Sequence, residues 1–345
     1  MNNSDEQYFN DIGRPISGVI YLTAALINVA TNIMLIYIFF RKRNHLGRIA
    51  VYKISLQMIL AQFFLVAAQI CPVVVLTFIN NIEMAKTFGS SHVATFLLEV
   101  DSLGYYSQTY FALLVAINAG NVFFFNQKLP GFKLDSIWIP ITITWIFVFC
   151  MVGIRNIFGI HKIFNVVQFF MFTIHDNESD LAYLWDFKVT PYLAYFTPCL
   201  IVAIYFSICV KVRKALKKMV FENDMNTHSS IPPTNTLRTT NIPSNQTKTK
   251  TTSIKTTTHA KTDPSQTKLL LQCILLSASA VLEPIVFTFI PYISPLFPVE
   301  YAFYVSMVLN LGILGLFTMP SWVLLFSNSE ISGEFKLIRR NLCCS

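Results

Sequence analysis

An all-α membrane protein, built as a bundle of seven membrane-spanning helices, is the fold class that this sequence predicts, and three observations predict it. Charged residues make up only 13% of the 345 residues and hydrophobic residues 54%, whereas a soluble domain carries about 25% charged residues. The hydrophobic residues gather in seven blocks, each long enough to cross about 30 Å of hydrocarbon as a helix. The basic residues gather in alternate connections between the blocks, as in a chain that crosses a membrane repeatedly.

The blocks follow one another with polar or basic connections between them. The first begins after 16 polar residues and ends at the basic loop RKRNHL. Because this block is long enough to be a span, we expect residues 1–16 to be an extracellular tail and not a cleaved signal peptide. The third block ends in three Phe and a basic exit, FFFNQK. Within one transmembrane domain over residues 17–326, the predicted spans cover 17–40, 50–77, 94–125, 136–157, 189–212, 268–292 and 301–326.

One further apolar run, from Ile163 to Phe172, is not expected to cross the membrane. Its ten residues are too few for a helical span, and a crossing there would move every later loop to the other side of the membrane. We therefore expect it to belong to a long extracellular loop over residues 157–188. Since no cysteine lies in this loop to tie it by a disulfide, it could act as a mobile lid.

The distribution of charge predicts the orientation. With the N-terminus outside, 21 of the 26 Lys and Arg residues fall on the cytoplasmic side, and the outer loops carry acidic residues. The net charge of +8 is therefore a topology signal, and nucleic-acid binding is not needed to explain it. Glycosylation sequons at Asn2 and Asn177 fall outside, where glycans can be added, and a third at Asn245 falls inside.

Two cytoplasmic segments stand apart in composition. Residues 223–266, between the fifth and sixth spans, are rich in Thr, Ser, Asn, Pro and Lys, and are predicted to be a disordered cytoplasmic loop. Residues 327–345 form a predicted cytoplasmic tail with a short amphipathic helix. Cys343 and Cys344 follow its basic part, a context that favours palmitoylation; the alternative is two free cytosolic thiols.

Several classes of function are disfavoured. All six His residues lie in loops or at span edges, so no cluster of His and carboxylates is expected inside the bundle. We therefore expect no metal, no cofactor and no enzymatic activity. No internal repeat supports the inverted architecture of secondary transporters.

Three acidic residues inside the spans are candidates for ligand binding. An ionisable group at membrane depth indicates function by default, and these are Glu99, Asp101 and Glu283. Asp101 lies one helical turn before Tyr105, so a carboxylate and an aromatic ring share one face, which suits a cationic or hydrogen-bonding ligand. Glu283 precedes Pro284 and could supply a second anchor. The alternative is that these acids only bond neighbouring helices and that an uncharged odorant is held by aromatic residues.

The chain resembles the seven-transmembrane G-protein-coupled receptors in an ordered set of positions. These are an Asn in the first span before the basic loop, a Trp in the fourth, a Pro followed by a Tyr in the fifth, and prolines in the sixth and seventh that imply helix kinks. The residues are Asn32, Trp145, Pro198, Tyr205, Pro284 and Pro320. The resemblance implies a membrane-surface helix and acylated cysteines after the last span.

The departures narrow the resemblance. Where that class has acid-Arg-aromatic at the inner end of the third span, this chain has AINAGNVFFF, with Asn118 for the acid and Ala119 for the Arg. Gln62 stands where an Asp is expected, Leu282 where a Trp precedes the proline, and MPSWV replaces Asn-Pro-x-x-Tyr. The pattern is similar to the nematode serpentine chemoreceptors, in the group that includes the Srg, Srv and Srx classes.

This resemblance implies a chemosensory receptor in the plasma membrane, including that of a sensory cilium. It would detect an extracellular small molecule or peptide and signal to a heterotrimeric G protein. The end of the third span, Asn118, Ala119, Gly120 and Asn121, would face the G protein, with neutral hydrogen bonds and a close backbone approach at Gly120 in place of an ion pair. Alternatively, these residues only pack against a neighbouring helix.

Two other functions remain open from the sequence. One is a membrane transporter or channel with Asp101 and Glu283 on a permeation path. The other is a receptor-like chaperone or decoy that does not couple to a G protein.

Overall fold

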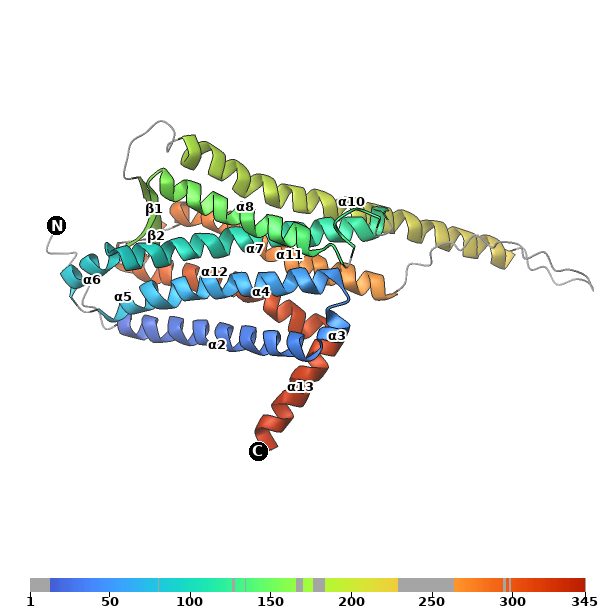
Figure 1. Cartoon of the computed structure of the whole chain (residues 1–345), viewed down its shortest axis with the longest axis horizontal. Coiled ribbons are helices and arrows are strands. Elements are labelled where there is room, and N and C mark those ends of the chain that lie inside the picture. The colour runs from blue at the N-terminus through green and yellow to red at the C-terminus, as the bar shows by residue number, and fades with distance from the viewer. Residues whose placement is uncertain are drawn as a thin grey trace, which may run out of the picture.

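The computed structural model describes residues 13–344 except 80, 126–127, 134, 166–169, 176–183, 229–263, 294–295 and 298. Its long helices lie side by side in one elongated bundle (Figure 1). They are α2 (Gly13–Arg41), α4 (Ala50–Ala68) with its continuation through η1 (Gln69–Val74) and α5 (Val75–Phe78), α7 (His92–Phe125), α8 (Trp138–Ile157), α10 (Thr190–His228), α11 (Pro264–Ile293) and α12 (Val299–Ser327).

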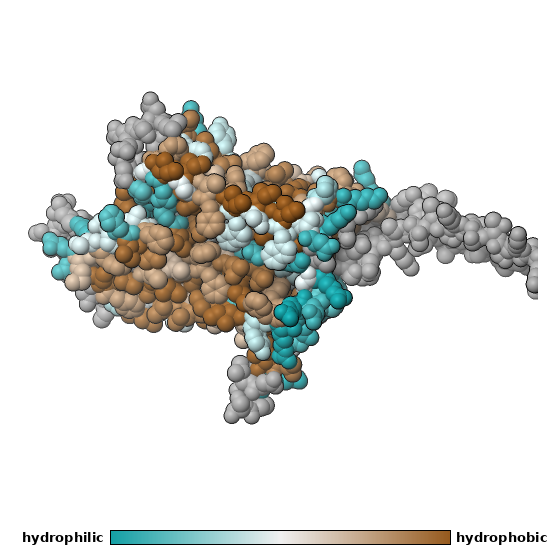
Figure 2. Space-filling model, in the orientation of Figure 1, coloured by the Kyte–Doolittle hydropathy of each residue, from teal (hydrophilic) through white to brown (hydrophobic). Residues whose placement is uncertain are grey.

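Within the part of the chain that the structure describes, seven helical segments are long and apolar enough to cross a membrane, which agrees with the seven predicted spans in number and order. Figure 2 shows a broad hydrophobic belt along the bundle, with hydrophilic residues gathered toward its two ends. The segments are Gly13–Arg41, Ala50–Phe78, His92–Phe125, Trp138–Ile157, Thr190–Ala215, Thr267–Val286 and Tyr304–Ser327.

Short elements distinguish the two ends of the bundle. One end carries α6 (Ile82–Gly89) and an antiparallel hairpin of β1 (Ile160–Asn165) and β2 (Phe170–His175), and is called the hairpin end below. The other carries α3 (Arg43–Leu46) and α13 (Ser329–Cys344), and is called the tail end. A further turn, η2 (Trp185–Val189), precedes α10. The predicted helix in the tail is confirmed as α13, which leaves the bundle at a steep angle in Figure 1.

The hairpin replaces what was predicted only as an extended loop. Its register pairs Ile160 with His175 and Asn165 with Phe170, so the apolar run from Ile163 to Phe172 is shared between two strands. The prediction that this run does not span the membrane as a helix is confirmed. Two strands of six residues satisfy each other's backbone groups, which is how a short apolar run can lie across one end of the bundle.

Two helices run further than predicted at the tail end. α10 continues to His228 and α11 begins at Pro264, so both enter the segment 223–266 that was predicted to lack structure. The extension of α10 is rich in Lys, Met, Glu and other strong helix formers, which carry the helix beyond its apolar span. The rest of that segment lies outside the described residues.

The helices α4 and α7 pack closely at Gly104. A Cβ atom there would lie 2.5 Å from Leu65 Cγ, 2.8 Å from Leu65 N and 3.0 Å from Ala61 O. At Gly120, by contrast, a Cβ would meet Ile204 at 3.6 Å, an ordinary contact. The prediction of a close backbone approach at Gly120 is therefore wrong, and the position on α7 that requires glycine lies about four turns nearer the hairpin end.

A buried polar cluster joins α2, α4 and α12 in the middle of the bundle. Ser321 Oγ lies 2.5 Å from Asn32 Oδ1 and 2.7 Å from Gln62 Oε1. A hydroxyl has one proton, so Ser321 donates to one of these two amide oxygens at a time, and Gln62 Nε2 has no hydrogen-bond partner among the described residues. Asn32 Nδ2 donates in turn to Asn28 Oδ1 at 2.8 Å. Asn32, which carries part of the receptor resemblance, therefore meets two positions at which the chain departs from it, Gln62 and Ser321.

Candidate ligand-binding site

A cavity of about 350 Å³ opens at the hairpin end of the bundle. This volume lies at the lower end of the range of about 300–1,000 Å³ that small-molecule sites occupy. Side chains from α7, α8, α10, α11, α12, η1 and the hairpin all contribute to its wall. They are Gln69, Asp101, Ser102, Tyr105, Tyr106, Arg155, Lys162, Met171, Thr173, Thr190, Ala194, Tyr195, Pro284, Asn310, Ile313 and Phe317.

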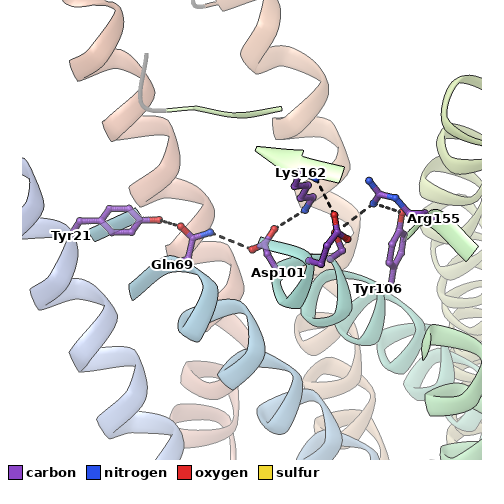
Figure 3. A network of polar contacts seen from close by, with 8 residues as sticks. Tyr21, Gln69, Asp101, Tyr106, Arg155 and Lys162 are labelled. Atoms are coloured by element: carbon purple, nitrogen blue, oxygen red, sulfur yellow. Dashed lines mark hydrogen bonds and ion pairs between the residues drawn. The ribbon is translucent and has the colours of Figure 1, made fainter. Parts of the chain in front are cut away.

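Asp101 is the centre of a polar chain that crosses this cavity (Figure 3). Its Oδ2 lies 2.7 Å from Lys162 Nζ, and its Oδ1 accepts a hydrogen bond from Gln69 Nε2 at 3.3 Å. Gln69 begins the π-helical turn η1, and its Oε1 accepts from the Tyr21 hydroxyl at 2.7 Å. A wider turn of this kind is common at functional sites. The four residues connect α2, η1, α7 and β1 without a gap.

Lys162 ties the hairpin to α7 through two separate contacts. Its side-chain Nζ pairs with Asp101, and its backbone N–H donates to Glu99 Oε1 at 2.9 Å. The strand β1 is therefore held down at one residue by two acids that lie two positions apart on the same helix. No disulfide was predicted for this loop, and an ion pair with a hydrogen bond holds β1 to α7 in its place, which argues against the mobile lid expected there.

Arg155, near the end of α8, provides a second cation on the cavity wall. It is 4% exposed, and its Nη1 donates to the Tyr106 hydroxyl at 3.3 Å and to Ser102 Oγ at 3.5 Å. The sequence did not single out Arg155 or Lys162 as candidates for this site. The signal that could have found Arg155 is its position within an apolar block, where a charge needs partners.

Aromatic side chains form the rest of the cavity wall near Asp101. Tyr105 packs edge to face on Tyr106 with ring centroids 5.3 Å apart, and both line the cavity together with Tyr195 and Phe317. The predicted pairing of a carboxylate and a tyrosine on one face of the third span is what the cavity presents. Such a wall can hold an apolar or aromatic group beside a charged one.

Glu283 lies behind the cavity wall. It is fully buried on α11, and neither carboxylate oxygen has a hydrogen-bond partner among the described residues. Its neighbour Pro284 lines the cavity, and Glu283 is close enough to Asp101 for the two charges to interact. A carboxylate is costly to keep ionised in such a place. The predicted second anchor therefore stands one residue away from the cavity surface.

At the tail end, the predicted G-protein-facing residues divide into two groups. Asn118 and Ala119 are buried and line a cavity of only about 20 Å³, next to Leu270 and Cys273 of α11. Asn121 has a local role, because its Oδ1 accepts from the Leu129 backbone N–H at 3.0 Å and so holds the connection between α7 and α8.

A lysine that the sequence did not single out holds the end of α7. Lys211 of α10 donates from Nζ to the Phe123 carbonyl and lies 5.0 Å from the ring centroid of Phe124. A cation is favoured at a helix C-terminus, where the last carbonyl groups lack partners within the helix. At the tail end, α7 and α10 are therefore joined by this side chain.

The tail helix is docked on the turn between α2 and α3. Glu334 pairs with Lys42 at 2.9 Å and with Arg41 at 3.4 Å, and Glu330 lies 2.9 Å from His45. The hydrogen bond from Lys42 holds the pKa of the Glu334 carboxyl below its usual value, against a smaller opposing effect of desolvation. These contacts fix where α13 starts relative to the bundle.

The remaining predicted residues are placed as follows. Pro198, Pro284 and Pro320 lie inside α10, α11 and α12, each of which continues past its proline. Asn2 and Asn177 lie outside the described residues. Cys343 and Cys344 form the end of α13. Their palmitoylation stays a prediction.

Among the residues that the structure describes, no group of three or more His, Cys, Asp or Glu side chains is placed to hold a metal ion. The length and composition of seven helices, packed in one bundle, define the class of the protein as multi-pass α-helical membrane proteins. No protein-family model matches the chain, and no curated protein matches it.

Proposed function

We propose that this protein is a seven-span chemosensory receptor that binds an extracellular small molecule or peptide and signals to a heterotrimeric G protein. The observation that carries the proposal is the cavity at the hairpin end, where Asp101 and Tyr105 face a strand held down by Lys162. In this proposal the hairpin end is extracellular, the tail end is cytosolic, and the plasma membrane, including that of a sensory cilium, holds the receptor. The resemblance to nematode serpentine chemoreceptors supports the same reading.

Ligand binding would act first on the contact between Lys162 and Asp101. A ligand that binds either charge breaks the ion pair between β1 and α7 and leaves the hydrogen bond from the Lys162 backbone to Glu99 as the remaining contact of Lys162 with α7 that is described above. From Asp101 to Phe123 the helix runs about 30 Å, so a shift of α7 is carried to the tail end. There, Lys211 joins it to α10. A ligand shifts such an equilibrium only by its difference in affinity for the two states.

Polar contacts between α7, α10 and α11 are the places where these helices can exchange between two arrangements. The Tyr205 hydroxyl of α10 donates to the Cys273 carbonyl at 2.9 Å and lies 3.0 Å from Ser277 Oγ. Ser277 donates to the Ala112 carbonyl of α7 at 3.2 Å. Nearer the cavity, Gln108 donates to Ser279 at 3.4 Å. Helix shifts that break and remake contacts of this kind are a common route of transmission.

The test is expression in a cell line with a G-protein activation readout, against a panel of charged and aromatic small molecules and short peptides. Asp101→Asn should reduce the response to an active ligand while surface expression is kept. The matched control is Glu83→Gln, which neutralises an exposed acid on α6 at the same end of the bundle. A response that is equal in the two variants would remove Asp101 from the ligand site, and the absence of G-protein activation by any ligand would favour a decoy.

A second candidate, a transporter or channel, is favoured by one observation. Glu283 is a fully buried acid next to Pro284 of the cavity wall, and its charge interacts with that of Asp101. Against it, Leu65, Ile313 and Phe317 form a cluster buried from solvent next to the cavity. Ligand-dependent current or uptake that is lost in Glu283→Gln would establish this candidate over the receptor.

A further inference from the structure

The cavity holds opposite charges in direct contact, and this limits the charge of what can bind there. Asp101 and Lys162 lie 2.7 Å apart, with side chains that are 7% and 19% exposed. Both line the cavity. At such low exposure, removal of one partner leaves the other as an uncompensated charge, which is strongly unfavourable. The pair therefore selects ligands by the charged groups that they carry.

Three kinds of ligand meet this pair differently. A cation that takes Asp101 leaves the Lys162 ammonium without its counter-charge, and an anion that takes Lys162 leaves the Asp101 carboxylate exposed to the same penalty. A zwitterion supplies both groups at once. Its ammonium can sit beside Asp101 Oδ2 and its carboxylate beside Lys162 Nζ, so that every charge keeps a neighbour of opposite sign.

We propose that this cavity takes a zwitterionic ligand that carries an aromatic or large apolar group, with a free ammonium and a free carboxylate as in an amino acid. The inference rests on the proposed function and names the ligand class of that site. Tyr105, Tyr195 and Phe317 supply the wall for the aromatic group. Gln69 holds the Asp101 carboxylate from the other side, so the acid keeps its position when Lys162 turns toward the ligand.

The first experiment uses three compounds that share one ring and differ in charge. Purified full-length protein in lipid nanodiscs is heated with phenylalanine, with phenethylamine or with 3-phenylpropionate, and its unfolding temperature is followed. We expect phenylalanine to stabilise the protein at a concentration about tenfold or more below that of either single-charge analogue. Equal or better stabilisation by phenethylamine or by 3-phenylpropionate overturns the inference, as does the absence of an effect from all three.

The second experiment reverses the selectivity. In Lys162→Met, Asp101 is left without its cation. Phenethylamine should therefore stabilise this variant at a concentration about tenfold or more below the one that the wild type needs, and phenylalanine should lose its advantage. In Asp101→Asn the gain should pass to 3-phenylpropionate. The control is Lys188→Met, which removes an exposed cation from η2 near the same end of the bundle and should leave the ranking of the three compounds unchanged. An unchanged ranking in Lys162→Met contradicts the inference.

Binding is measured here without a G protein, which separates the two claims. Signalling to an active ligand with no preference for zwitterions sinks this inference alone. Zwitterion-selective binding with no signalling sinks the receptor proposal alone. If Lys162→Met does not fold, the exchanged pair Asp101→Lys with Lys162→Asp keeps both charges, and it should keep the preference for phenylalanine.

Discussion

Gly104 gives the sharpest prediction for stability. In Gly104→Ala the new methyl group lies 2.5 Å from Leu65 Cγ, and 2.8 Å and 3.0 Å from the backbone atoms Leu65 N and Ala61 O. A side chain can rotate away, but two backbone atoms of α4 cannot yield unless the whole helix moves. Overpacking of this kind costs about 1–3 kcal/mol, and the better helix propensity of Ala returns about 1 kcal/mol. We therefore expect a net loss of up to about 2 kcal/mol.

The matched control is Gly120→Ala on the same helix. Its Cβ meets Ile204 at 3.6 Å, which needs no movement, so only the propensity gain of about 1 kcal/mol remains. Thermal unfolding of the purified protein in detergent should place Gly104→Ala below the wild type and Gly120→Ala at or above it. If both variants unfold at the same temperature, the close approach of α4 and α7 at Gly104 is refuted.

Two further predictions concern the tail end. Lys211→Met removes the side chain that binds the Phe123 carbonyl, so basal G-protein activation should rise. The control Arg213→Met, which removes a neighbouring exposed cation, should leave basal activation unaltered. Equal basal activity in the two variants would exclude Lys211 as a restraint. Because the folded-state pKa of Glu334 is lowered from 4.5, its pairing with Lys42 stabilises docking of α13 above that pH and is lost as the pH falls through the lower folded value. A spin label on α13 should become more mobile only below about pH 4.5 in the wild type, and a wild-type profile identical to that of Glu334→Gln would contradict this.

The helical spans could be predicted because each is set by a local property, the length of an apolar block. The tail helix could be predicted for the same reason, from its charge pattern after the last span. Asp101 and Tyr105 could be placed on one face because one helical turn separates them. These inferences need only the periodicity of a single helix.

The partners across the cavity could not be predicted in this way. Lys162 reaches Asp101 over 61 positions of sequence and Arg155 reaches Tyr106 over 49, so only the packed bundle brings them together. The choice between Gly104 and Gly120 depends on how near α4 lies at the first and α10 at the second, which neither glycine's own sequence neighbours reveal. The hairpin was missed because its two strands are too short to show a clear alternation.

Because Lys162 is held on α7 by two contacts, its own side chain competes with a ligand for the site. Any ligand that must separate Lys162 from Asp101 is opposed by a partner that is covalently attached and never diluted. If the pair were open in about 1% of molecules, the ligand concentration needed for half-occupancy would rise about a hundredfold. The ligand concentration that produces a response can then be changed by residues that do not contact the ligand. A change at Tyr21, which donates to the Gln69 side chain that holds Asp101, would reset the sensitivity of the protein without altering which molecules it recognises.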